Sequence, residues 1–143
     1  MTSILFDLCN TVMLLAWVFL LFVPKWSFTQ HLITFPWIPL GISFFYTYFL
    51  IVSGGLAEAD FSNLEGITKL FRLATPESAA AGWLHYLAFD FWVGTWIIRH
   101  SRRHQISHWV ILPALAFTFM LGPIGIMAYS IIYFIKHRLK KAK

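Results

Sequence analysis

Four long apolar stretches, separated by short polar blocks, constrain this chain more than any other feature. They cover 4–23, 37–53, 77–99 and 107–135. About 20 mostly apolar helical residues are needed to cross the ~30 Å hydrocarbon core of a bilayer. With 59% hydrophobic and 12% charged residues, the chain is also more apolar than a soluble domain of its length. The sequence therefore predicts an all-α, polytopic membrane protein: a bundle of about four transmembrane helices that forms a single transmembrane domain over 1–143.

Local signals mark the starts of two of these stretches. The first is interpreted as a retained span and not as a secretory signal, because no basic region precedes it, Asp7 lies inside it and no small-residue cleavage site follows. The third begins with Thr75 as the expected N-cap, Pro76 at the first helical position and Glu77 at the positive end of the helix dipole. Both stretches are expected to be continuous helices.

The fourth stretch is longer than one span requires, and Gly122-Pro123-Ile124-Gly125 interrupts it. Proline and glycine weaken a helix, so either a kink or a re-entrant turn is expected here. With four full spans, seven Lys and Arg residues lie on the side of the N-terminus and four on the other side. With a turn at Pro123 the tail changes sides, which leaves two Lys and Arg residues on the side of the N-terminus and nine on the other. The positive-inside rule favours the turn. Two pieces of about 15 residues are each too short to span, so the prediction is one kinked helix over 107–135.

Two further segments are polar. Residues 54–76 contain a capping-box pattern, Ser62 with Glu65, followed by apolar residues on one helical face. This pattern predicts a short amphipathic helix at the membrane interface, which would act as a surface anchor or as a lid over a lipophilic pocket. Residues 136–143 form a basic tail. Because the basic residues adjoin apolar stretches, the net charge of +5 indicates contact with lipid phosphates, not with nucleic acid.

Cysteine and histidine usage gives little sign of a metal site. Cys9 is the single cysteine, so an internal disulfide and a multi-cysteine metal site are excluded. His100, His104 and His108 are spaced four residues apart and would share a face only on one continuous helix. Two arginines lie between them, and the segment is expected to be a turn. No metal site is predicted, and the cofactor is unknown.

Ionisable residues inside a span are candidates for function, because a polar group in hydrocarbon costs free energy unless it is paired. Away from its ends, the third stretch holds two, His85 and Asp90. At five residues apart they lie about 140° apart around a helix and so face different directions. Asp90 lies near mid-span, where it is expected to be protonated, hydrogen-bonded or paired.

Polar and aromatic residues on the other stretches either line a site with these two or serve packing alone. Aromatic residues make up 19% of the chain, and an aromatic-lined groove suits a long, conjugated or isoprenoid ligand. The candidate catalytic residues are Asp90 and His85. The candidate substrate-binding residues are Trp83, Tyr86, Phe89, Trp92, Trp96, Tyr46, Asp7 and Asn10.

The most specific string in the chain is Gly82-Trp83-Leu84-His85-Tyr86-Leu87-Ala88-Phe89-Asp90-Phe91-Trp92-Val93-Gly94-Thr95-Trp96-Ile97. It resembles the G-W-x-H-x-L-x-x-D-x-x-V-G-x-W-I pattern of the abscisic-acid-deficient-4 family, membrane proteins linked to neoxanthin formation in plants. The later Gly122-Pro123-Ile124-Gly125 is similar to the G-P-x-G element of that family.

The resemblance implies a four-span plastid or bacterial membrane protein of carotenoid metabolism. In plants the family is required to convert violaxanthin into neoxanthin and is associated with trans-to-cis carotenoid isomerisation. Because the first span begins almost at Met1, no transit peptide is expected, and the expected location is the bacterial inner (cytoplasmic) membrane. Many bacteria make no violaxanthin, so the resemblance implies a role for the helix of His85 and Asp90 and a lipophilic polyene as ligand.

Three functions remain open. The first is an enzyme that isomerises a carotenoid-like polyene, in which Asp90 donates a proton and His85 orients the substrate or assists the transfer. The second is a non-catalytic membrane protein that binds a carotenoid or scaffolds another enzyme. The third is a haem-binding membrane protein that uses His85 and another histidine. The expected partners are membrane lipid and a polyene ligand, an oligomer is compatible with the sequence, and nucleic acid is not expected.

Overall fold

The computed structural model describes residues 1–55 and 59–141, and over these ranges the chain forms seven helices and no strand. The helices are α1 (Thr2–Phe22), α2 (Ser27–Thr34), α3 (Trp37–Val52), α4 (Leu64–Arg72), α5 (Pro76–Arg103), α6 (His108–Leu121) and α7 (Pro123–Lys141). The all-α prediction is confirmed. Parts of the predicted interfacial segment (56–58) and of the basic tail (142–143) lie outside the described residues.

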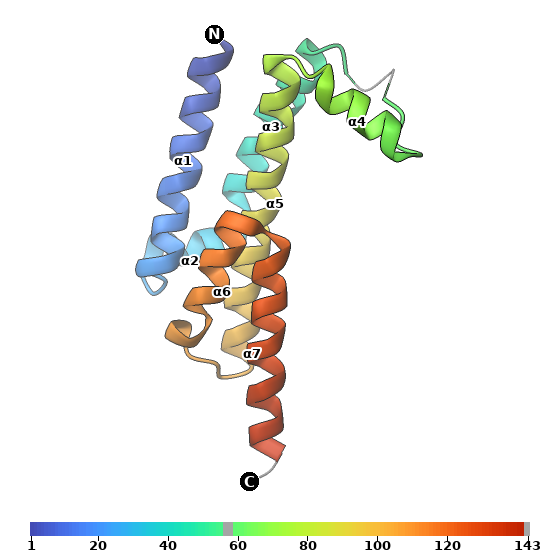
Figure 1. Cartoon of the computed structure of the whole chain (residues 1–143). Coiled ribbons are helices and arrows are strands. Elements are labelled where there is room, and N and C mark those ends of the chain that lie inside the picture. Colours follow the sequence, from blue (N-terminus) through green and yellow to red (C-terminus); the bar gives the residue numbers. More distant parts are fainter. Residues whose placement is uncertain (56–58, 142–143) are drawn as a thin grey trace.

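Helix α5 lies at the centre and packs against α1, α2, α3, α6 and α7 (Figure 1). It begins where the sequence predicts, because the Thr75 hydroxyl accepts a hydrogen bond of 3.2 Å from the backbone N–H of Ser78 and Pro76 occupies the first turn. It ends at Arg103, beyond the expected boundary at 99. Its buried face includes Leu84 and Phe91, which belong to the core shared with the neighbouring helices.

The contact between α1 and α5 depends on a glycine. A methyl group built on Gly94 would lie 2.6 Å from Cη2 of Trp17, so the indole packs directly on the backbone of α5. Trp17 is 1% exposed. Its ring centroid lies 5.6 Å from that of Phe91 and 5.4 Å from that of Phe119. A side chain at position 94 would therefore have to displace an aromatic ring that is enclosed on several sides.

Helix α2 is absent from the sequence-based prediction. It precedes α3 at a bend of 59°, and long-range hydrogen bonds from α5 hold it in place. Arg99 Nη1 donates to the carbonyl of Ile33 at 2.6 Å. Arg102 donates to Oε1 of Gln30 at 2.7 Å and to the carbonyl of Pro24 at 3.0 Å. The two guanidinium groups satisfy carbonyls near the ends of α1 and α2, where helix termini leave acceptors unpaired.

The prediction of one kinked helix over 107–135 is wrong. Helix α6 ends at Leu121, α7 begins at Pro123, and the two helices lie side by side as a hairpin (Figure 1). Pro123 cannot continue the hydrogen-bond ladder of α6, and Gly122 at the elbow has a φ of +38°. The helices approach so closely that a methyl group built on Gly125 would overlap Thr118. The turn at Pro123, which the charge distribution favoured, is therefore the arrangement observed.

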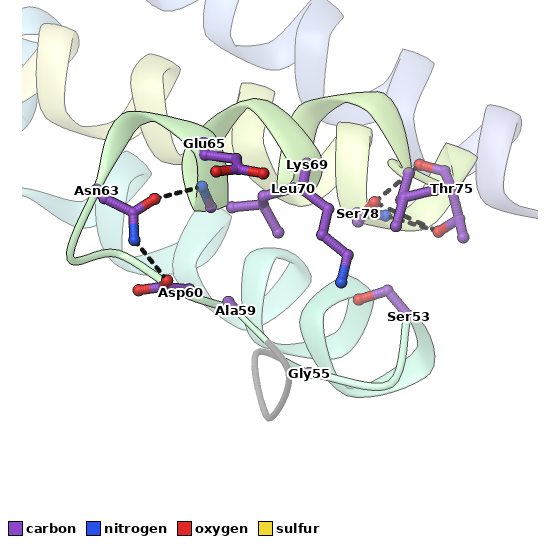
Figure 2. A pocket seen from close by; sticks show the side chains of 12 residues that line it. Ser53, Gly55, Ala59, Asp60, Asn63, Glu65, Lys69, Leu70, Thr75 and Ser78 are labelled. Carbon is purple, nitrogen blue, oxygen red and sulfur yellow. Dashed lines mark hydrogen bonds between the residues drawn. The ribbon is translucent and has the colours of Figure 1, made fainter.

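Helix α4 confirms the predicted helix in the 54–76 segment but begins differently. The N-cap is Asn63, whose side-chain oxygen accepts a hydrogen bond of 2.8 Å from the backbone N–H of Gly66. Ser62 instead donates its hydroxyl to Asp60 at 2.6 Å, so the capping box of Ser62 with Glu65 does not form. Figure 2 shows the Asn63 side chain between Asp60 and the first turn of α4.

Large apolar side chains cover much of the outer surface. Phe44 on α3 is 72% exposed, Ile51 on α3 is 71% exposed, and Phe71 on α4 is 68% exposed. Soluble monomers rarely leave so much apolar area in contact with water. Among the helices described, α1 alone is long and apolar enough to cross a membrane, and α2 with α3 passes the same test as one broken span. The expected bundle of four full spans is not confirmed, because α5 does not pass this test by itself and the fourth stretch is divided between two helices.

Candidate functional site

A groove of about 490 Å³ lies between α1, α5 and the elbow that joins α6 to α7. Its walls are mainly apolar, and its polar groups are an amide, an indole N–H, a phenol and one carboxyl. The lining residues are Asn10, Met13, Leu14, Trp83, Tyr86, Leu87, Asp90, Phe119, Met120, Leu121, Gly122 and Pro123. A groove of this size and composition suits an apolar ligand that is positioned by a few polar contacts.

The carboxyl of Asp90 lies beside the elbow. A methyl group built on Gly122 would lie 2.7 Å from Oδ1 and 3.3 Å from Oδ2, so a side chain at position 122 would have to displace the carboxyl. Asp90 is half-buried, and no group within 1–55 or 59–141 donates a hydrogen bond to it. Gly122 immediately precedes α7, and the partial positive charge of a helix N-terminus stabilises a nearby carboxylate. The position therefore suits a group that gains and loses a proton.

A hydrogen bond joins the two long walls of the groove. Nε1 of Trp83 on α5 donates to Oδ1 of Asn10 on α1 at 3.2 Å. Trp83 also lines a second hollow of about 620 Å³ with Met1, Phe6 and Pro76, toward the N-terminal ends of the same two helices. The two hollows thus adjoin along the seam between α1 and α5, with the Trp83 indole at their shared boundary.

The structure separates the two predicted catalytic residues. His85 lies on another face of α5, as its angular separation from Asp90 predicts. Its ring centroid is 5.8 Å from that of Tyr46 on α3 and 4.8 Å from that of Phe89. The ring of Trp92 continues this row at 6.2 Å from Phe89. These aromatic residues form a surface row and do not line the groove that holds Asp90.

Trp96 belongs to a third group, between α5 and α7. Its ring stacks on His100 at 5.1 Å, and Nδ1 of His100 is hydrogen-bonded to the hydroxyl of Tyr129 at 2.6 Å. His104 lies 4.4 Å from His100, whereas His108 begins α6 and bonds to a backbone carbonyl of α1 at 2.9 Å. The three histidines therefore do not share one helix. No group of three or more His, Cys, Asp or Glu in the part of the chain described here is arranged to hold a metal ion.

Sequence reasoning found part of the groove and missed part. Asn10, Trp83 and Tyr86 line it together with Asp90, while Asp7 is exposed and does not line it. The apolar walls from α1 and the elbow were not among the predicted contacts. The glycine and proline of the G-P-x-G element pointed to the elbow, but this element was interpreted as a break in a helix and as a family motif, and its residues were not named as candidate contacts.

A separate polar hollow of about 380 Å³ lies under α4, between the end of α3 and the start of α5 (Figure 2). Its lining includes Asn63 and Lys69 but no aromatic residue, so it does not suit a conjugated apolar ligand. Hydrogen bonds from Ser62 and Asn63 lower the pKa of the Asp60 carboxyl below its ordinary value of 3.8. These contacts stabilise the start of α4.

Comparison with known proteins identifies a family. The family model described as ABA4-like, ABA DEFICIENT 4-like, matches residues 4–129, which include every residue that lines the groove. No curated protein and no solved structure matches the chain.

Proposed function

Since the chain belongs to the ABA DEFICIENT 4-like family, we propose that it isomerises a carotenoid-like polyene within a membrane, with Asp90 as the proton donor. Membership of this family associates the chain with a membrane and with a carotenoid-related function. The isomerisation is our inference. The observation that carries it is a single carboxyl in an apolar, partly aromatic groove between α1, α5 and the elbow.

We place α1, the α2–α3 pair and α5 across the membrane, with the α6–α7 hairpin entering and leaving from one side. Helix α5 is not apolar enough to pass as a span by itself, but its 28 residues are long enough, and five other helices pack against it. Helix α6 has 14 residues, about 21 Å at 1.5 Å per residue, and cannot cross a core of ~30 Å. Irregular backbone at membrane depth must be covered by protein, and α5 packs against both arms of the hairpin. Nine of the Lys and Arg residues then lie on the side of the tail and two on the other. The positive-inside rule assigns the tail to the cytoplasm of a bacterial inner membrane.

Thiol labelling tests this topology. Cys9 is the single cysteine and is buried, so a membrane-impermeant thiol reagent should report only on introduced cysteines. Ser3→Cys and Arg138→Cys should react from opposite sides of the membrane. Reaction from the same side would refute the hairpin topology and restore four full spans.

The shape of the seam between α1 and α5 suits an extended molecule. A polyene lying along it would contact the two adjoining hollows, with the Trp83 indole at their boundary. The faces of Trp83 and Tyr86 could stabilise a cation in the polyene, because the face of an aromatic ring carries partial negative charge.

The proposed reaction requires only a proton. Asp90 in its protonated form transfers its proton to a polyene carbon, so that one O–H bond breaks and one C–H bond forms. The resulting carbocation is delocalised, and the former double bond can rotate. Return of the same proton to the carboxylate gives the cis polyene, so the cycle consumes no oxidant or reductant. Because His85 lies on another face of α5, this step does not use it.

Pigment analysis tests the proposal. The protein is expressed in a bacterial host that accumulates an all-trans carotenoid, and the isomers are separated by chromatography. A cis isomer should form with the wild type and with the control His85→Gln, which alters an ionisable residue on another face of the same helix. Asp90→Asn should abolish the isomer while pigment still co-purifies. An unchanged isomer yield in Asp90→Asn would remove this residue from the reaction.

A non-catalytic carotenoid-binding protein is the second candidate. The observation that favours it is the lack of a second carboxyl or of an imidazole beside Asp90 among the residues that line the groove. Carotenoid that co-purifies with a well-expressed protein, with no change in isomer composition, would select this function over the isomerase.

A further inference from the structure

We propose that a second pocket, at the basic end of the bundle, binds a phosphate group. The pocket has a volume of about 360 Å³ and lies between the end of α5, the turn that follows it and α7. Its lining includes Arg103, His104, Gln105, Tyr133, Lys136 and His137. The proposal does not depend on the isomerase function, because none of these residues lines the Asp90 groove.

The charged side chains that line this pocket are all positive. Arg103 and Lys136 are cations, and the two histidines add ring nitrogens that can donate hydrogen bonds. No Asp or Glu lines the pocket, and none occurs in the sequence after Asp90. An anion that enters therefore meets a positive potential that no neighbouring carboxylate cancels.

The three arginines near the end of α5 differ in their hydrogen bonds. Arg99 and Arg102 donate to backbone and side-chain oxygens of the α1–α2 region, which stabilises the fold. Arg103 makes no hydrogen bond within the described ranges and lines the pocket instead. A guanidinium group presents N–H donors in a planar fork that matches two phosphate oxygens. The donors of Arg103 are thus available to a ligand.

The walls of the pocket are held in place before a ligand binds. The Tyr133 ring packs edge-on against His104 at 4.9 Å and against His137 at 5.9 Å. Gln105 has a φ of 55°, a backbone conformation that favours glycine. The backbone N–H of Ile106 donates to the carbonyl of Ser101 at 2.9 Å and closes the end of α5 around this residue. Strained backbone of this kind occurs often at ligand sites.

The phosphate could belong to an anionic lipid headgroup or to a soluble phosphate ester, and both present the same oxygens to the pocket. The turn after α5 and the C-terminal end of α7 lie at the same end of the molecule (Figure 1). In the proposed topology this end is at the cytoplasmic membrane surface, where anionic headgroups are found.

Lipid retention by the full-length protein tests the proposal. The protein in neutral detergent is titrated with phosphatidic acid or phosphatidylcholine, and bound lipid is counted by native mass spectrometry. Arg103→Gln/Lys136→Gln should bind phosphatidic acid about 25-fold more weakly than the wild type, at about fivefold for each cationic side chain removed. The matched control Lys69→Gln/Arg72→Gln removes the same charge from α4 and should bind as the wild type does. Lys136→Arg keeps the charge and should also bind normally.

A competition experiment identifies the source of the phosphate. Competition by inorganic phosphate or pyrophosphate would show that the phosphate group is sufficient, and lipid binding without such competition would show that the acyl chains are also needed. With either result, the proposal holds only if Arg103→Gln/Lys136→Gln binds phosphatidic acid more weakly than the wild type. Equal affinity of this variant and the wild type, with equal thermal unfolding, would overturn the proposal, as would an equal loss in the α4 control.

Discussion

The contact between Trp17 and Gly94 gives the sharpest test of how α1 packs on α5. In Gly94→Ala the new methyl group would lie 2.6 Å from Cη2 and 3.0 Å from Cζ3 of the indole. Trp17 is 1% exposed and cannot move aside without disturbing neighbouring aromatic rings. Gly82→Ala is the matched substitution, because Gly82 lies in the same helix and, apart from the adjacent helix backbone, nothing lies within 4 Å of its built methyl group.

The comparison of Gly94→Ala with Gly82→Ala isolates the energetic cost of the clash with Trp17. Replacing glycine by alanine inside a helix stabilises it by about 1 kcal/mol, and this gain is common to both variants. Overpacking a core costs about 1–3 kcal/mol, and only Gly94→Ala incurs it. We therefore expect Gly82→Ala to have a higher free energy of unfolding than the wild type. The free energy of unfolding of Gly94→Ala should be about 1–3 kcal/mol lower than that of Gly82→Ala.

Reversible unfolding in mixed detergent micelles measures these free energies. A double-mutant cycle adds Trp17→Phe, whose smaller ring should relieve part of the clash, so this change should cost less in the Gly94→Ala background than in the wild type. If both alanine variants are equally stable, or if Trp17→Phe costs the same in both backgrounds, the described packing of α1 on α5 is wrong.

Three further outcomes follow from the loops and the elbow. Gln105→Gly should stabilise the protein by about 1 kcal/mol, because glycine adopts a positive φ without steric cost; thermal unfolding measures the gain, and Gln105→Ala should show none. The lowered pKa of Asp60 means that its hydrogen bonds add stability above the ordinary value of 3.8, and that this stability is lost as the pH falls through the lowered pKa. The Ser62 amide resonance should follow that step in an acid titration, and a step at or above the ordinary value would contradict it. Gly122→Ala should destabilise the protein by about 1–2 kcal/mol, because a methyl group at that φ also meets the Asp90 carboxyl; the added change Asp90→Ala should recover part of the loss in unfolding measurements.

Features that depend on nearby residues could be predicted from the sequence. The start of α5 follows from Thr75 and Pro76, which act on backbone groups within one turn. The separation of His85 from Asp90 follows from helix geometry alone. The grouping of Trp83 and Tyr86 with Asp90 follows from the same periodicity, and the structure places all three in one groove.

Features that depend on distant contacts could not be predicted. Helix α2 is short and partly polar, and its stability depends on arginines that lie 66 or more positions away in the chain. The apolarity of 107–135 fits a kinked span and a hairpin equally well, and its length favours the kinked span. The close approach of Gly125 to Thr118, which no local pattern reveals, accompanies the hairpin. The charge distribution favoured the hairpin, but the prediction gave more weight to the short length of each arm. Length is not decisive, because the arms of a hairpin that packs against α5 do not have to cross the membrane.

The hairpin also has a consequence for how the protein is made. In the proposed topology the α6–α7 hairpin begins and ends on the same side of the membrane, so nothing that follows α5 has to be translocated across it. The elbow at Gly122 can enter the bilayer only after α5 is in place, because its irregular backbone needs protein around it. The order of synthesis supplies this condition, since α5 leaves the ribosome before α6 and α7. The groove around Asp90 would then be the last part of the protein to form, and it would stay open to lipid until the hairpin docks.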